Sequence, residues 1–254
     1  MPLDVNSSVF NHVAYVVLSV PKGTKEDYEL AGFWQDFGVI REEGAFFNDG
    51  DLEYTIIDSD NNYVSVAKYE TNLIDVLIIP ETVNKEDIIY TITSISDHAF
   101  IYCSSLTSVI IPESVISIGV SAFGECSSLT NVFIPESVIS IDYYAFEECS
   151  SLLSVSIPEG VTSIESSTFT GCSSLLGVSI PEGVTSIGSF AFSGCSSITN
   201  VVLNWKIPLA INLNVFRNVI FGSIVLTVPK GTKEDYELAG VWKEFKSITE
   251  ADIN

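Results

Sequence analysis

The sequence predicts an α/β-type repeat solenoid, in which coils of 23 residues stack and each contributes a short strand to a parallel sheet. Two observations predict this fold class. The first is an internal repeat, because proline, cysteine and phenylalanine recur at a constant offset of 23 residues along the middle of the chain. The second is composition: of 254 residues, 46% are hydrophobic and 17% are charged, which supplies a sizeable core and excludes intrinsic disorder.

Each coil of the repeat is predicted to contain one short strand followed by a turn. The alternation around Val109 and Ile111 is typical of a half-buried strand, and Pro112 ends it because proline has no N–H to donate. Serines at the turns are expected to bond local backbone groups. A coil this short cannot bury its own apolar side, so stacking should align apolar residues in interior rows. These rows are Phe100, Phe123, Phe146, Phe169 and Phe192; Cys103, Cys126, Cys149, Cys172 and Cys195; Leu106, Leu129, Leu152, Leu175 and Ile198; and Val109, Val132, Val155, Val178 and Val201.

Residues 1–43 are predicted to be the tail and cap of a preceding repeat module. The twelve-residue segment PKGTKEDYELAG occurs at 21–32 and again at 229–240, an offset of 208. In each copy a threonine, Thr232 in the second, is expected to cap a short helix with Asp235 in a shortened capping box. The aromatic residues that follow should cover the open end of a sheet, namely Tyr28, Trp34 and Phe37 in the first copy.

Residues 44–90 are predicted to form a β-hairpin segment that closes the first coil. The stretches EYTIID and YVSVAKY, and then VLIIPETV and IIYTITSI, alternate in the manner of paired strands. Asp58, Asp60 and Asn62 match the start of a calcium loop, but Tyr63 stands where that loop needs glycine and Tyr69 where it needs glutamate. The residues between the first two stretches are therefore interpreted as a hairpin turn.

Residues 91–204 are predicted to be the solenoid itself, and 205–254 its final coil and carboxy-terminal cap. The coil signature A-F-x-x-C-S-S-L-x-x-V-x-I-P-E-x-V resembles the BspA-type leucine-rich repeat of surface proteins from host-associated anaerobic bacteria and some parasitic protists. The chain departs from it at Thr168, where alanine is usual, and at Asn204 and Trp205, which replace Pro-Glu. The resemblance implies that this protein acts as an adhesin that engages host extracellular proteins such as fibronectin and fibrinogen, or other bacteria.

Charge and residue usage exclude several classes of function. Eleven basic residues against thirty-three acidic ones give a net charge of −22, so the field of the protein repels nucleic acid. The two histidines cannot build a multi-histidine metal site, His98 is interpreted as structural, and no nucleophile elbow, phosphate loop or zinc motif occurs. An enzyme is therefore not expected, and neither is a cofactor. Because no Lys or Arg lies between Lys85 and Lys206, partners of the repeats should be neutral or basic.

Two further rows contain residue types that can bind metal ions, the cysteines and a row of glutamates. Stacked cysteines would hold their side chains parallel, with Cβ atoms about 5 Å apart, which is too far for a disulfide, so buried reduced thiols are expected. The carboxylates of Glu113, Glu136, Glu159 and Glu182 should align at the same spacing after successive strands. A solvated rim is the simpler interpretation of that row, and bridging by calcium or by a basic partner is the alternative.

The candidate binding site is the outward face of the strands. The positions two before each proline, with Asn131 beside them and Trp205 as an extension, give the set Ile110, Asn131, Phe133, Ser156, Ser179, Val202 and Trp205. Large apolar residues at one end of this set are unusual on a solvated surface.

The leading hypothesis is a non-catalytic, adhesin-like binding module, at the cell surface or secreted, that engages host extracellular proteins or other cell-surface macromolecules through this face. It is expected to be a monomer, with its export signal outside this chain, since Asp4 and the short apolar run at 13–20 do not form a signal peptide. The alternative is a structural spacer module in a longer tandem-repeat protein. An enzyme or a glycan-binding accessory is the third possibility; a sugar site would need clustered exposed aromatics, for which Phe133 and Trp205 are the candidates.

Overall fold

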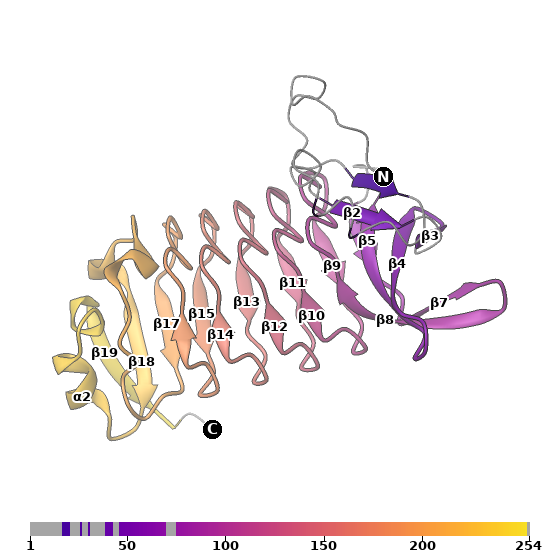
Figure 1. Cartoon of the computed structure of the whole chain (residues 1–254). Coiled ribbons are helices and arrows are strands. Elements are labelled where there is room, and N and C mark those ends of the chain that lie inside the picture. Colours follow the sequence, from indigo (N-terminus) through magenta and orange to yellow (C-terminus); the bar gives the residue numbers. More distant parts are fainter. Residues whose placement is uncertain are drawn as a thin grey trace.

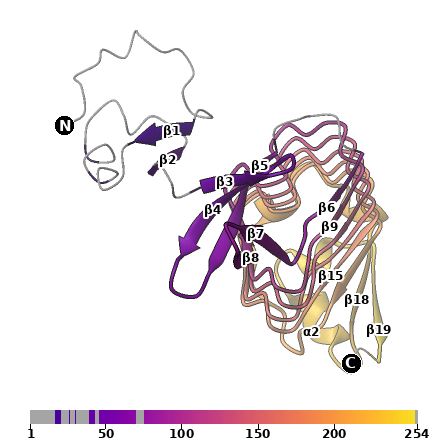
Figure 2. The same cartoon turned by 90° about the vertical axis from the view of Figure 1, so that its right-hand side faces the viewer.

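Residues 75–252 coil repeatedly in the same sense and stack into an elongated solenoid (Figure 1). We analysed a computed structural model, which describes residues 17–20, 26, 30, 39–42, 46–69 and 75–252. Seen along its length, successive coils superimpose around a shared interior (Figure 2). We number five coils by the phenylalanines at which they begin, Phe100, Phe123, Phe146, Phe169 and Phe192.

The main sheet of the solenoid consists of eight parallel strands, one from each turn of the chain. Each strand ends where proline or a turn removes the next ladder hydrogen bond. Equivalent residues pair directly, with Val109 opposite Val132 and Val155 opposite Val178, so the 23-residue repeat sets the register. In spatial order the strands are β6 (Val76–Ile78), β9 (Ser108–Ile110), β11 (Asn131–Phe133), β13 (Ser154–Ser156), β15 (Gly177–Ile180), β17 (Asn200–Leu203), β18 (Val225–Pro229) and β19 (Ser247–Ala251).

The coils also carry a second, two-residue strand on another side of the solenoid. The sequence predicts a single strand per coil, and the structure therefore adds one to that expectation. A Ser-Ile pair is too short to show a recognisable alternation, although each isoleucine points inward and is buried or nearly so. These strands are β10 (Ser117–Ile118), β12 (Ser140–Ile141), β14 (Ser163–Ile164) and β16 (Ser186–Ile187).

The hairpin segment joins β10 and β12 in a seven-stranded sheet. The first expected hairpin is confirmed as β4 with β5, and Asp58 closes it by accepting hydrogen bonds from the backbone of Asp60 and Asn61. In the second, β8 pairs antiparallel with the shorter β7. The structure adds one strand that was not predicted, β3, which pairs antiparallel with β4. The bounds are β3 (Phe46–Asp49), β4 (Leu52–Asp58), β5 (Tyr63–Tyr69), β7 (Thr82–Lys85) and β8 (Ile88–Ile95).

Strand β6 corrects the interpretation of VLIIPETV as one arm of a hairpin. It runs parallel to β9 in the main sheet, with Leu77 opposite Val109 and Ile78 opposite Ile110. VLIIPE is therefore an earlier copy of SVIIPE, at an offset of 32 residues instead of 23. The extra residues form the tip of the β7–β8 hairpin, which Figure 1 shows extending from the solenoid.

The core consists of the predicted rows. Phenylalanine rings stack from coil to coil with centroids 5.2 to 5.5 Å apart, and the stack continues past Phe192 to Phe216. Serines reinforce the stacking in a way the sequence does not predict. The hydroxyl of Ser150 donates to the carbonyl of Ser127 in the preceding coil, and Ser173 and Ser196 repeat this bond, so these side chains join coils instead of closing local turns.

The described part of the amino-terminal region contains one parallel strand pair, β1 (Val17–Val20) and β2 (Val39–Glu42). Val17 lies opposite Val39, and 208 residues later Val225 lies opposite Ser247 in β18 and β19. The internal sequence repeat is thus matched by a repeat of strand pairing. Tyr28, Trp34 and Phe37 lie outside the described residues, and the assignment of 1–43 to a preceding module stays a prediction.

The carboxy-terminal cap closes the core with aromatic side chains. It contains η3 (Leu213–Phe216), η4 (Phe221–Ser223), α2 (Lys233–Leu238) and η5 (Trp242–Glu244). Tyr236, Trp242 and Phe245 are all buried, as expected from their positions in the repeat. Trp242 and Phe245 pack edge-on against Phe216, the last ring of the stack, so these aromatic side chains cover the end of the core.

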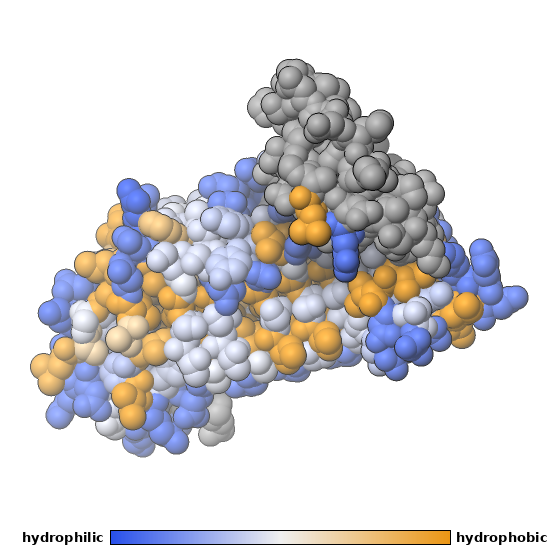
Figure 3. All heavy atoms as spheres, viewed as in Figure 1, coloured by the Kyte–Doolittle hydropathy of each residue, from blue (hydrophilic) through white to orange (hydrophobic). Residues whose placement is uncertain are grey.

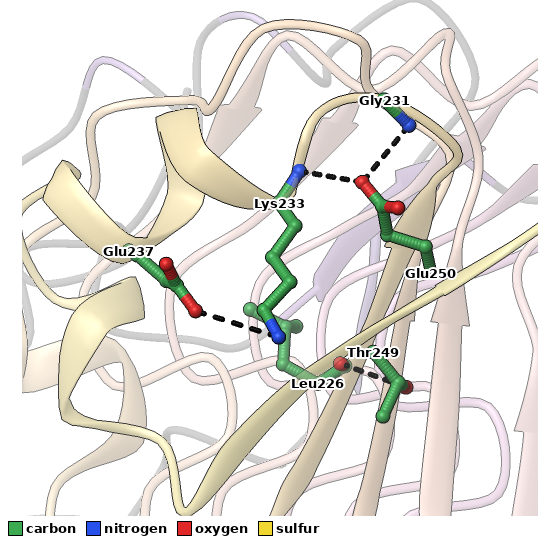
Figure 4. Close-up of polar contacts among 6 residues, drawn as sticks. All are labelled: Leu226, Gly231, Lys233, Glu237, Thr249 and Glu250. Carbon is green, nitrogen blue, oxygen red and sulfur yellow. Dashed lines mark hydrogen bonds and ion pairs between the residues drawn. The ribbon is translucent and has the colours of Figure 1, made fainter.

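The predicted capping box at Thr232 is wrong. The threonine hydroxyl donates to the carbonyl of Pro229, and its side chain makes no cap bond to α2. A carboxylate of Glu250 in β19 instead accepts the backbone N–H groups of Gly231 and Lys233 at 2.9 and 3.0 Å (Figure 4). These bonds lower the pKa of Glu250, the bond from Lys233 most.

Over the described ranges, no helix is both long enough and apolar enough to cross a membrane. Residues 183–205 contain no Asp, Glu, Lys or Arg, and they form strands β16 and β17 and the turns around them.

Candidate binding face

The outward positions of the main sheet form a straight row across the strands. Backbone pairing places Ile78 beside Ile110, Ile110 beside Phe133, and Ser179 beside both Ser156 and Val202. Because neighbouring strands are about 4.8 Å apart, the row continues from coil to coil at that spacing. Five of the predicted residues, Ile110, Phe133, Ser156, Ser179 and Val202, therefore lie in a single line, and their role in binding stays a prediction.

One end of this line is apolar and exposed. The exposed fractions are 63% for Ile78, 49% for Ile110 and 62% for Phe133, and we call these three residues the apolar row. Ser156 and Ser179 are exposed, and Val202 is half-buried. Ile78 is not among the residues predicted for this face, because its coil is offset from the next by 32 residues instead of 23. The match of VLIIPE to SVIIPE is the sequence signal that identifies it. Viewed as in Figure 3, the coils present hydrophobic residues among near-neutral ones.

Trp205 is not part of the exposed face, which corrects the prediction. Only 5% of its surface is exposed, and its ring packs edge-on against Trp242 with centroids 6.0 Å apart. The hydroxyl of Tyr236 donates to the carbonyl of Trp205 at 2.9 Å. The aromatic cap therefore encloses this tryptophan.

Asn131 lies on the same face as the apolar row, in a parallel row two residues earlier along the strands. It is exposed, and its amide donates to the hydroxyl of Thr130 at 3.2 Å. Val76 occupies the equivalent position in β6 and is also exposed, which adds a fourth apolar residue to this end of the face.

The row of glutamates follows the strands at the next turn, and all four of its members are exposed. We call Glu113, Glu136, Glu159 and Glu182 the acidic row. Glu136 accepts the backbone N–H of Glu159 from the following coil at 3.1 Å, so this carboxylate is tied to the turn of its neighbour. Beyond the turn, coils 1 and 2 expose Ile116 and Ile139.

No group of three or more His, Cys, Asp or Glu in the described ranges is placed to hold a metal ion. The five cysteines are buried thiols, as predicted. From Cys126 onward each Sγ donates to the carbonyl of a phenylalanine in the preceding coil at 3.1 to 3.3 Å. Burial raises the pKa of every thiol, to about 11 for Cys103 and about 12 for Cys149. The row is structural and unreactive near neutral pH.

Exposed aromatic residues also occur away from the strand face, at the outer turns of the return segments. Tyr102, Tyr143 and Tyr144 are each 40 to 48% exposed. Tyr102 and Tyr144 occupy left-handed backbone positions, with φ of 63° and 59°. Of the aromatic residues, only Phe133 and Trp205 were predicted to be exposed, so the tyrosines on this side of the solenoid were not among the predicted site residues.

Solved structures of bacterial leucine-rich repeat proteins are similar to this chain. One is the leucine-rich repeat protein of T. pallidum, 23% identical, covering 82% of each chain with a TM-score of 0.57, which shows the fold. Another, from Bacteroides capillosus, is 32% identical over 46% of this chain and 85% of its own, with a TM-score of 0.43. A leucine-rich cell surface protein of Faecalibacterium prausnitzii is 23% identical over 80% of this chain and 72% of its own, with a TM-score of 0.47.

No curated protein matches the sequence. The family model of the BspA-type leucine-rich repeat region matches residues 93–221 in six copies. That range covers half of the chain and holds all five stacked phenylalanines of the predicted repeat, from Phe100 to Phe192. The chain therefore belongs to the BspA-type leucine-rich repeat family.

Proposed function

We propose that the protein is a non-catalytic binding module, displayed at the cell surface or secreted, that engages a macromolecule through the outward face of its main sheet. The observation that carries the proposal is the apolar row, in which three large side chains stand exposed side by side on one face of the main sheet. Large contiguous patches of exposed apolar surface are rare on soluble monomeric proteins, and those that occur often mark interaction sites.

Charge defines the partner that suits this face. The twelve acidic residues between Lys85 and Lys206 have no basic residue among them, so the repeats attract neutral or basic partners and repel nucleic acid. Family membership supports a role at the cell surface, with host extracellular proteins or other cell-surface macromolecules as partners. We propose that the module acts as a monomer, without a cofactor.

The test is binding of the protein to an immobilised panel of matrix proteins and glycans, beside a Phe133→Ser variant. Saturable binding should weaken about 30-fold in the variant, the cost of losing a central aromatic contact. The melting temperature should hardly change, because exposed substitutions alter stability by less than about 0.5 kcal/mol.

Ile220→Ser is the matched control, since Ile220 is 70% exposed but lies in the cap. It should bind like the unmodified protein. Equal binding by the Phe133→Ser variant would contradict the strand-face assignment.

A second candidate function is that of a spacer in a tandem-repeat protein. The observation that favours it is the β1–β2 pair, which repeats the register of β18–β19 after 208 residues. Repeated modules would hold another domain away from the surface. A folded protein that binds no member of the panel would support this role over the first.

A further inference from the structure

We propose that the partner of the strand face is a cationic amphipathic helix, which seats its apolar side chains on the apolar row and its Lys or Arg side chains against Glu113 and Glu136. The inference rests on the proposed function and deepens it, because it specifies the chemistry of the partner. Charge complementarity and the placement of exposed apolar side chains on both sides of the acidic row carry it.

The first step is the composition of one turn in coils 1 and 2. In coil 1 the exposed residues around the turn are Ile110, Glu113 and Ile116. In coil 2 the equivalent residues are Phe133, Glu136 and Ile139, and they are exposed as well. Each carboxylate therefore stands between two large apolar side chains.

The second step is the charge balance of these carboxylates. Glu113 and Glu136 lie in adjacent coils, and the coils supply no Lys or Arg to neutralise them. Like charges in adjacent positions repel one another. A partner cation would relieve that repulsion, and the flanking apolar side chains would exclude water and strengthen the attraction.

The third step is spacing. Rows on the sheet repeat at about 4.8 Å along the solenoid, close to the pitch of about 5.4 Å of an α-helix. A helix laid along the apolar row would place residues i, i+4 and i+7 opposite Ile78, Ile110 and Phe133. Basic residues beside that stripe would reach the acidic row.

The repeat supplies a matched control. Coils 3 and 4 keep the acidic row at Glu159 and Glu182, but their flanking residues are Ser156, Thr162, Ser179 and Thr185. The double variant Glu159→Gln with Glu182→Gln is the control pair. It removes two negative charges from the acidic row, as many as the test pair does, at positions that have no large apolar side chains beside them. Glu113→Gln with Glu136→Gln is the test pair, and glutamine keeps an oxygen that can accept the N–H of Glu159.

The experiment measures binding of a labelled synthetic peptide of about 18 residues, with a leucine stripe flanked by lysines, by fluorescence anisotropy. The test pair should weaken binding about tenfold, the sum of two partly shielded ion pairs, and the control pair less than about twofold. The unmodified protein should bind a peptide with glutamine in place of lysine about as weakly as the test pair binds the lysine peptide.

Equal losses in the two pairs would overturn the inference, because attraction would then come from the whole acidic surface. Failure of the peptide to bind, while Phe133→Ser still weakens binding to a member of the panel, would overturn it and leave the proposed function intact. Failure of both assays would overturn the proposed function as well.

Discussion

Coils 1 and 2 share their interior with coils 3 and 4 but differ from them on the surface. Phe123 in coil 2 and Phe169 in coil 4 are both buried in the same stack, and so are Leu129 and Leu175 in their row. On the surface the coils differ, because Phe133 and Ile139 of coil 2 correspond to Ser179 and Thr185 of coil 4. Inward positions therefore preserve the fold, and outward positions are free to acquire or lose a binding surface.

Alkaline pH should have the largest effect on stability, because it acts on the interior that coils 1 and 2 share with coils 3 and 4. Burial raises the pKa of each cysteine thiol, whereas an unfolded thiol ionises near 9.0. The unfolded state therefore loses protons first, and stability that is present below pH 9 should fall as the pH rises toward 11. The expected loss is about 1.4 kcal/mol per pH unit for each thiol.

Urea unfolding at pH 8 and pH 10 would measure this loss. Cys126→Ala in coil 2 and Cys172→Ala in coil 4 should each reduce the pH slope by the share of one thiol. Stability that does not change between the two pH values would show that the thiols are not buried as described.

Truncation of the phenylalanine stack should give a smaller but still large effect. Phe123→Ala and Phe169→Ala should each cost about 3 to 5 kcal/mol, because each leaves a cavity between two stacked rings. The two costs should be similar if the interiors are equivalent, because the cost depends on how far each site can relax around the cavity. A difference of several kcal/mol in chemical denaturation would mean that the two halves are packed differently.

The smallest effect concerns a turn where the coils differ in backbone strain. Glu148 in coil 3 has a φ of 54°, and the equivalent residue in coil 4 is Gly171, with a φ of 75°. Left-handed backbone costs a side-chain-bearing residue about 1 to 2 kcal/mol, and glycine loses about 0.5 to 1 kcal/mol more backbone entropy on folding, so Glu148→Gly should stabilise the protein by about 0.5 to 1 kcal/mol. Thermal unfolding would measure it.

Glu148→Gln separates strain from charge, because it removes the carboxylate but keeps the Cβ atom. It should recover only the part of the gain that comes from reduced repulsion with neighbouring carboxylates. A loss of stability in Glu148→Gly would contradict the assignment of strain.

The repeat made most of the fold predictable, because equal spacing fixes both the register of the strands and the rows of the core. Three features escaped for physical reasons. The Ser-Ile strands such as β10 are too short to show a period, and β6 is displaced by the inserted hairpin. The cap of α2 was predicted at the nearby Thr232, but the group that accepts the backbone N–H of Lys233, the first residue of α2, is Glu250, which only the folding of β19 brings close.

The candidate site was predictable where it depended on strand alternation alone. Ile110 and Phe133 point outward because Val109 and Val132 point inward. Trp205 lies beyond the last regular strand, where alternation gives no direction, and its burial depends on Tyr236 and Trp242 from the distant cap. Ile116 and Ile139 were missed because they follow the turn, where no simple periodicity holds.

The parallel ladder of the main sheet also has a mechanical consequence. Its strands lie across the long axis, so tension along that axis would part adjacent coils one after another instead of shearing a whole sheet at once. Each coil adds about 4.8 Å to the folded length. Once parted, its 23 residues would extend to about 80 Å. A chain of such coils would therefore lengthen in steps under load.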